Sequence, residues 1–140
     1  MEITRFVAGP LSENVWCVPV GGNRVMLVDP GGEASSIIAY LGAAGLVISS
    51  IVCTHGHFDH IAALPAVARA FPGASVLAHP GEAEWFGPGA IGRHHDFFVR
   101  IGAGNYIKRY REEVPSVTGT LVDGDVLDGW TVRHTPGHSP

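Results

Sequence analysis

The chain has 140 residues, of which 46% are hydrophobic and 16% charged, so its composition is that of one soluble globular domain and excludes a disordered chain. The formal net charge of -4 excludes the dense basic surface that nonspecific nucleic-acid binding needs. No stretch approaches a membrane span and the N-terminus lacks a signal-peptide pattern, so we expect a cytoplasmic protein with no membrane partner.

The first part of the chain predicts strands. Residues 2–7 and 14–20 are separated by the turn signal Gly9-Pro10, and residues 21–23 lead tightly into a third strand at 24–28. The last two strands therefore form a hairpin.

Helices then alternate with strands. A helix is expected at 34–44, a buried strand at 48–53, an Ala- and Leu-rich helix at 61–71 and a short strand at 75–78. This alternation predicts a layered α/β domain. The only cysteines, Cys17 and Cys53, fall inside expected strands, where buried thiols are more often packing residues than a disulfide.

Residues 81–113 show no clean period, and two readings stay open: an inserted lid and a partly helical connector. Short strands are expected again at 120–122, 125–127 and 130–135. Five of the nine basic residues fall between 93 and 111, where they form either a docking site for an anionic group or a solvated charged face: Arg93, Arg100, Lys108, Arg109 and Arg111.

Three histidines and a carboxylate lie within the six residues from His55 to His60. Neutral imidazole and carboxylate are the usual protein ligands of zinc and its first-row neighbours. His55, His57 and Asp59 share one parity in an extended segment and His60 has the other, so a bent loop that serves two adjacent metals fits best. The alternative is a polar loop that happens to be rich in histidine.

This loop connects the strand at 48–53 to the helix at 61–71. Asp59 or His60 should therefore lie in the first helical turn, where amide groups and the helix dipole favour a carboxylate. The carboxyl end of a strand is also where open α/β sheets place their sites.

The stretch from Thr54 to His60, together with Thr135-Pro136-Gly137-His138, resembles the metallo-β-lactamase superfamily. The segments from Val28 to Gly32 and from Gly9 to Asn14 are similar to its hydroxyacylglutathione hydrolase (glyoxalase II) branch. The match covers nearly the whole chain apart from about residues 85–115, whose role stays unassigned. The resemblance implies an α/β fold, namely the N-terminal part of an αββα sandwich.

The resemblance also implies the ligands. His55, His57 and His138 would hold a first metal, and Asp59 and His60 would contribute to a second. The cofactor is expected to be zinc, as one or two ions, with iron or manganese as alternatives. The family's next two ligands, a bridging aspartate and a final histidine, have no counterpart here.

We therefore expect residues 1–140 to be one metallo-β-lactamase-like domain whose C-terminal part is missing. Half a sandwich would leave one face of its sheet uncovered. A longer protein could supply the cover, or a second copy of the chain in a homo-oligomer.

Three histidines leave a fourth metal position for water, which is the arrangement of catalytic zinc, and hydroxide is then available near neutral pH. The sequence thus predicts a metal-dependent hydrolase that attacks a thioester or related acyl bond of a small anionic substrate, with Asp59 as a catalytic residue that orients the hydroxide. The alternatives are a mononuclear iron persulfide dioxygenase and an inactive metal-binding fragment.

Other polar residues have competing roles. Asp29 can orient a ligand imidazole or cap the following helix. We expect His79 to be structural and His134 to be structural or to support a ligand. His94 and His95 are expected on the surface.

Overall fold

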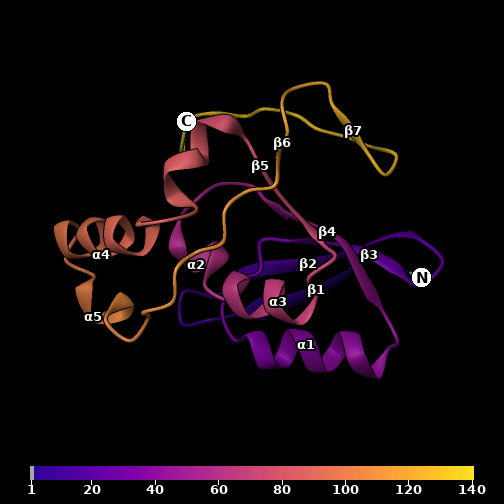
Figure 1. Ribbon diagram of the computed structural model, residues 1–140, viewed down its shortest axis with the longest axis horizontal. Coiled ribbons are helices and arrows are strands. Elements are labelled where there is room, and N and C mark those ends of the chain that lie inside the picture. Colours follow the sequence, from indigo (N-terminus) through magenta and orange to yellow (C-terminus); the bar gives the residue numbers. More distant parts are fainter. Residues whose placement is uncertain (1) are drawn as a thin grey trace.

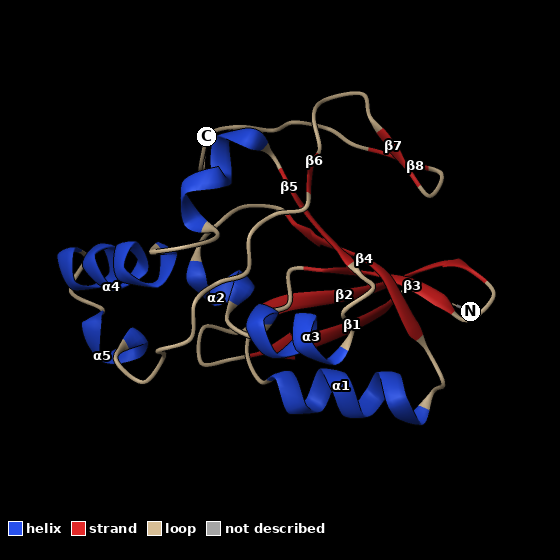
Figure 2. Cartoon of the chain, viewed as in Figure 1, coloured by secondary structure: helices blue, strands red, loops and turns tan. Residues whose placement is uncertain are grey.

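The computed structural model describes residues 2–140, which are organised on a six-stranded mixed sheet with the order β1-β2-β3-β4-β5-β6 (Figure 1). The first three strands pair antiparallel and the rest pair parallel. Figure 2 distinguishes the strands from the helices. The strands are β1 (Thr4–Ala8), β2 (Glu13–Gly21), β3 (Arg24–Val28), β4 (Val47–Cys53), β5 (Ser75–Ala78) and β6 (Gly119–Thr120).

The predicted hairpin is confirmed as β2 and β3. Gly21 and Gly22 have φ values of 117° and 59°, a region that glycine enters without steric cost, so the chain reverses tightly at this point. Side chains then alternate along β2: Val15 and Cys17 are buried, whereas Trp16 between them is 38% exposed. Cys17 and Cys53 are buried free thiols, as expected.

Helices cover one face of the sheet. Helix α1 (Ala34–Ala43) buries Ile37 and Leu41 and lies beside α3 (Leu64–Ala70) in Figure 1. The helix expected at 61–71 is confirmed as α3 but begins later than expected, because α2 (Phe58–Ile61) ends before α3 begins. Pro65 at the start of α3 has no backbone N–H to continue a longer helix, and the N–H of Ala63 bonds to the Pro30 carbonyl at 2.9 Å.

The opposite face is covered only in part by the described chain. The hairpin of β7 (Val126–Leu127) and β8 (Trp130–Thr131) lies over Met26 and Val52, and a cavity of about 290 Å³ remains between them. These strands are shorter than the expected 125–127 and 130–135, since each forms only two pairs. On this face Trp16 is 38% exposed, and that a further part of the sandwich covers it stays a prediction.

Residues 81–113 form a partly helical connector. They contain the 3₁₀ turn η1 (Pro80–Trp85), α4 (Ala90–Arg100) and α5 (Gly104–Ile107), with aromatic rings packed between them. His94 was wrongly expected on the surface: it is 1% exposed, between Phe58 and Trp85. His95 is half-buried, and its Nε2 lies 2.8 Å from the Tyr110 carbonyl.

Within the described residues, no helix combines the length and the apolar character that crossing a membrane requires.

Candidate metal centre

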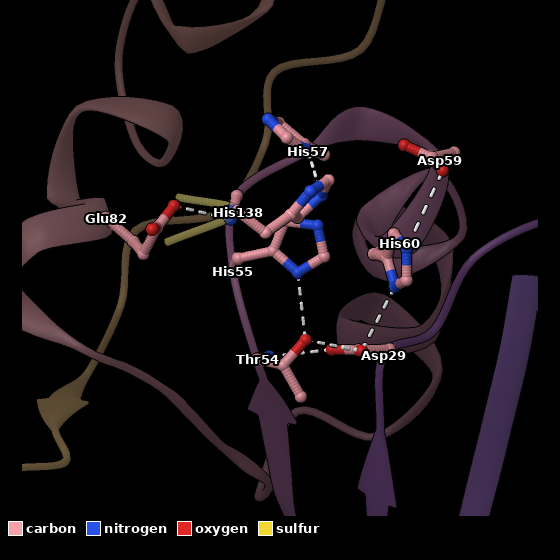
Figure 3. A network of polar contacts seen from close by, with 9 residues as sticks. Asp29, Thr54, His55, His57, Asp59, His60, Glu82 and His138 are labelled. Carbon is pink, nitrogen blue, oxygen red and sulfur yellow. Dashed lines mark hydrogen bonds and ion pairs between the residues drawn. The ribbon is translucent and has the colours of Figure 1, made fainter. Parts of the chain in front are cut away.

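The histidine-rich loop lies where two neighbouring parallel strands end. Asp29 follows β3 directly, and Thr54 follows β4. His57 is the N-cap of α2 and Asp59 lies in the first turn of this short helix, and not in that of the longer helix expected at 61–71. The terminal segment brings His138 to the same edge, so residues far apart in sequence face each other (Figure 3).

Three imidazoles converge at this edge. His55, His57 and His138 each offer one ring nitrogen, and these three atoms lie within 4.8 Å of one another. The Nδ1 atom of His57 is 3.0 Å from the Nε2 atom of His138. The three ring centroids are 4.7 to 4.9 Å apart. One ion can be reached from all three rings.

The environment of the His55 Nε2 atom shows whether these residues are suited to bind a metal. His55 is 8% exposed, and its Nε2 has no hydrogen-bond partner among the described residues. A buried polar atom normally has a partner, because leaving it unpaired costs about 1 to 3 kcal/mol. A metal ion satisfies a nitrogen lone pair, so the three-histidine group fits zinc or a similar ion.

Asp29 and Thr54 determine which nitrogen of His55 carries the proton. The Thr54 amide and hydroxyl donate to the two carboxylate oxygens of Asp29 at 2.7 and 2.6 Å. Because its single proton is used, the hydroxyl can only accept from the Nδ1 of His55, which is 3.0 Å away. His55 therefore carries its proton on Nδ1 and presents a free lone pair on Nε2.

A second group of donors adjoins the first. Asp29, His55 and His60 also offer atoms within 4.8 Å of one another, and the Nδ1 of His60 donates to Asp29 at 3.1 Å. Asp29 thus orients an imidazole and does not cap α1, whose N-cap is Glu33. Asp59 belongs to neither described group, and its Oδ2 lies 3.6 Å from the Nε2 of His60. That Asp59 and His60 share an ion stays a prediction.

The surroundings shift the pKa of His55, His57 and His60. Burial and the neighbouring His60 and His57 lower the pKa of His55 to about 4. Burial, with help from His138, also lowers the pKa of His57. The hydrogen bond to Asp29 raises the pKa of His60 against the effect of burial. His55 is thus neutral at pH 7 and its lone pair is available.

His79 has the structural role that we expected. Its Nδ1 accepts a hydrogen bond from the Gly81 amide at 3.1 Å and so caps η1. The ring of His134 stacks on it at a centroid distance of 4.1 Å, and His134 belongs to neither donor group.

Sequence reasoning missed two buried acids near the loop. Glu82 accepts from the Gly56 amide at 2.7 Å. Glu13 is 5% exposed, and neither of its carboxylate oxygens has a partner in the described chain. A glutamate at the start of an apolar strand is a signal that could have revealed Glu13. Glu82 lies in residues 81–113, where the sequence shows no clear helix or strand periodicity.

The fold and the site define a class: an α/β protein with a histidine cluster for metal on the loops at one edge of its sheet. The chain belongs to the Metallo-beta-lactamase superfamily, which matches residues 8–140.

Three relatives illustrate this membership. The Probable metallo-hydrolase YqgX of Bacillus subtilis (strain 168) is 29% identical over 145 residues, which is 100% of this chain and 63% of that protein. A hydroxyacylglutathione hydrolase of Aliivibrio salmonicida (strain LFI1238) is 37% identical over 68 residues, 49% of this chain and 27% of the relative. The crystal structure of TTHA1623 in a di-iron-bound form is 29% identical, with a TM-score of 0.78 over 98% of this chain and 63% of that one.

The chain therefore spans less than two thirds of the length of each of these relatives.

Proposed function

We propose that the protein is a metal-dependent hydrolase that cleaves a thioester or related acyl bond of a small anionic substrate. The observation that carries this proposal is the convergence of His55, His57 and His138, with a buried lone pair of His55 aimed into the group. Neutral imidazoles around one ion, with a position left for water, are typical of catalytic zinc and not of structural zinc.

The residues of the site have distinct roles in this proposed reaction. The bound ion would polarise the acyl carbonyl and make hydroxide available near neutral pH. His55, His57 and His138 would hold it, and Asp29 keeps His55 in the required tautomer through Thr54. Asp59, in the first turn of α2, would orient the attacking water by accepting its hydrogen bond.

The relatives support the kind of reaction and leave the metal open. The matched part of the Aliivibrio salmonicida protein, a hydroxyacylglutathione hydrolase, favours a thioester substrate. We propose zinc as the metal, with iron or manganese as alternatives, because imidazole ligands suit all three to some degree and TTHA1623 holds two irons.

One arginine lies over the aromatic ring that stacks on His57, and we propose that it contacts an anionic substrate. The Arg100 guanidinium lies 5.7 Å from the centroid of the Phe97 ring, which stacks on His57 at 5.6 Å. Other basic side chains have local partners: Arg93 donates to the Glu84 carbonyl at 2.6 Å. Arg100 is the residue of this basic segment that we assign to a substrate anion.

We expect the zinc-loaded chain to hydrolyse a hydroxyacylglutathione thioester, and a chelator to abolish the activity until zinc is restored. The His55→Gln variant should lose about 100-fold or more, because the buried ligand nitrogen is gone. Thioester turnover and metal content are measured together, with His134→Gln as the control outside both donor groups.

Other outcomes would replace this proposal. One iron per chain with oxygen consumption would favour the persulfide dioxygenase. Metal binding without turnover of any acyl substrate would mean that these 140 residues are an inactive metal-binding fragment.

We also propose that a second copy of the chain covers the open face of the sheet. Trp16, Val126 and Trp130 are exposed apolar side chains, and Met26 and Val52 line the cavity beneath the terminal hairpin. Light scattering of the wild-type protein should give the mass of a dimer. The Trp16→Lys variant should have the mass of a monomer. A wild-type chain that is already monomeric would contradict this proposal.

A further inference from the structure

The short turn η1 contacts both segments that carry the converging histidines. The Gly56 amide, between His55 and His57, donates to the Oε2 of Glu82 at 2.7 Å. At the neighbouring Gly81, a Cβ atom would lie 3.3 Å from the Cβ of Pro140, close to His138. One turn thus lies against the loop and against the terminal segment.

Packing holds the same point of the loop from another side. A Cβ at Gly56 would lie 2.4 Å from the Cβ of Trp85, so only glycine lets the two chains approach this closely. The next helix adds Phe97, whose ring stacks on His57 at a centroid distance of 5.6 Å. The backbone at Gly56 is therefore confined by η1, and the ring of His57 is packed against α4.

Glu82 also brings a buried carboxyl group. It is 1% exposed, and its Oε1 has no partner among the described residues. Imidazoles bind a metal as neutral ligands, so a divalent ion held by these three would keep both of its charges. In Figure 3, Glu82 lies on one side of the imidazoles, while Asp29 and Asp59 lie on the other.

We propose that Glu82 is a positioning residue of the metal centre, which holds the backbone between His55 and His57 and supplies buried negative charge to the ion. This inference rests on the metal site of the proposed function. A carboxylate that supports ligands without touching the metal typically changes affinity about 10- to 100-fold when it is removed.

The test compares Glu82→Gln, which keeps an acceptor for the Gly56 amide but loses the charge, with Glu82→Ala, which loses both. Zinc affinity is measured by competition with a chromophoric chelator, well below the unfolding temperature of each metal-free variant. We expect affinity about 10-fold weaker for Gln and about 100-fold weaker for Ala. The control is Glu112→Gln, at an exposed residue paired with Arg69.

A spectroscopic measurement separates positioning from simple stabilisation. In cobalt-loaded protein, both Glu82 variants should shift the ligand-field absorption, and Glu112→Gln should not. If both Glu82 variants bind zinc within about twofold of wild type and leave the cobalt spectrum unchanged, Glu82 has no role toward the ion. A wild-type chain that binds no zinc would instead remove the proposed function.

Discussion

Replacing Asp29 with asparagine is expected to weaken zinc binding about 10- to 100-fold with little change in the backbone. Asp29 accepts from the Thr54 amide, the Thr54 hydroxyl and His60. An asparagine has only one oxygen, so its amide group must face at least one of these donors. In the variant, the N–H group of the new asparagine therefore faces a donor of Thr54 or His60 that Asp29 accepts in the wild type.

The changed hydrogen-bond directions affect metal binding through His55. If the new amide donates to the Thr54 hydroxyl, that hydroxyl is free to donate to the Nδ1 of His55. The imidazole then carries its proton on Nε2, the atom that faces the other ligands, and that proton blocks coordination. His60 also loses its hydrogen-bond acceptor, so one substitution disturbs both groups of candidate metal ligands.

The matched control is Asp128→Asn. Asp29 and Asp128 have φ values of 51° and 49°, a left-handed conformation that both aspartate and asparagine tolerate, and Asp128 is exposed. Chelator competition gives the affinities, and ¹⁵N chemical shifts of the imidazoles report the tautomers. Zinc binding by Asp29→Asn at wild-type strength would mean that Thr54 does not relay the effect of Asp29.

The second large effect is a loss of stability in acid that depends on His94. Burial lowers the pKa of His94 from 6.5 to about 4, against its hydrogen bond to the Trp85 carbonyl. As the pH falls through about 6.5 the unfolded chain gains a proton at this residue, whereas the folded chain does not until about pH 4. The free energy of unfolding therefore falls over this window, by on the order of 3 kcal/mol.

A variant isolates this contribution from that of the other histidines. His94→Gln keeps an N–H donor for the Trp85 carbonyl but cannot titrate. Denaturant unfolding of metal-free protein at several pH values between 7.5 and 4 should show a flatter dependence for the variant. Parallel curves for the two proteins would mean that His94 is protonated as easily in the folded state as in the unfolded one.

The strands and their alternation with helices were predictable because they depend on local patterns. The glycine pair at 21–22 and the apolar run of β4 determine those elements within a few residues. The helix at 61–71 was less accurate, since a proline at the second position of α3 ends one helix and starts another. Composition alone does not show which of these two outcomes a proline produces.

The converging histidines were predictable in identity, because few other patterns place so many imidazoles together. Their supports were harder to predict. Asp29 was a candidate with two roles, and only its distances to Thr54 and His60 distinguish them. Glu82 and His94 depend on contacts between residues far apart in sequence, which no local period reveals.

The wide sequence separation of the histidines gives the bound ion a mechanical effect. His57 and His138 are 81 positions apart, yet their nitrogens lie 3.0 Å from each other. If one ion is bound by both residues, as we propose, it links the terminal segment to the histidine-rich loop in the folded state and stabilises that state by its binding free energy. Removal of the ion would then release the terminal segment together with β7 and β8. We expect this segment to resist proteases when zinc is bound and to be cleaved faster when zinc is removed.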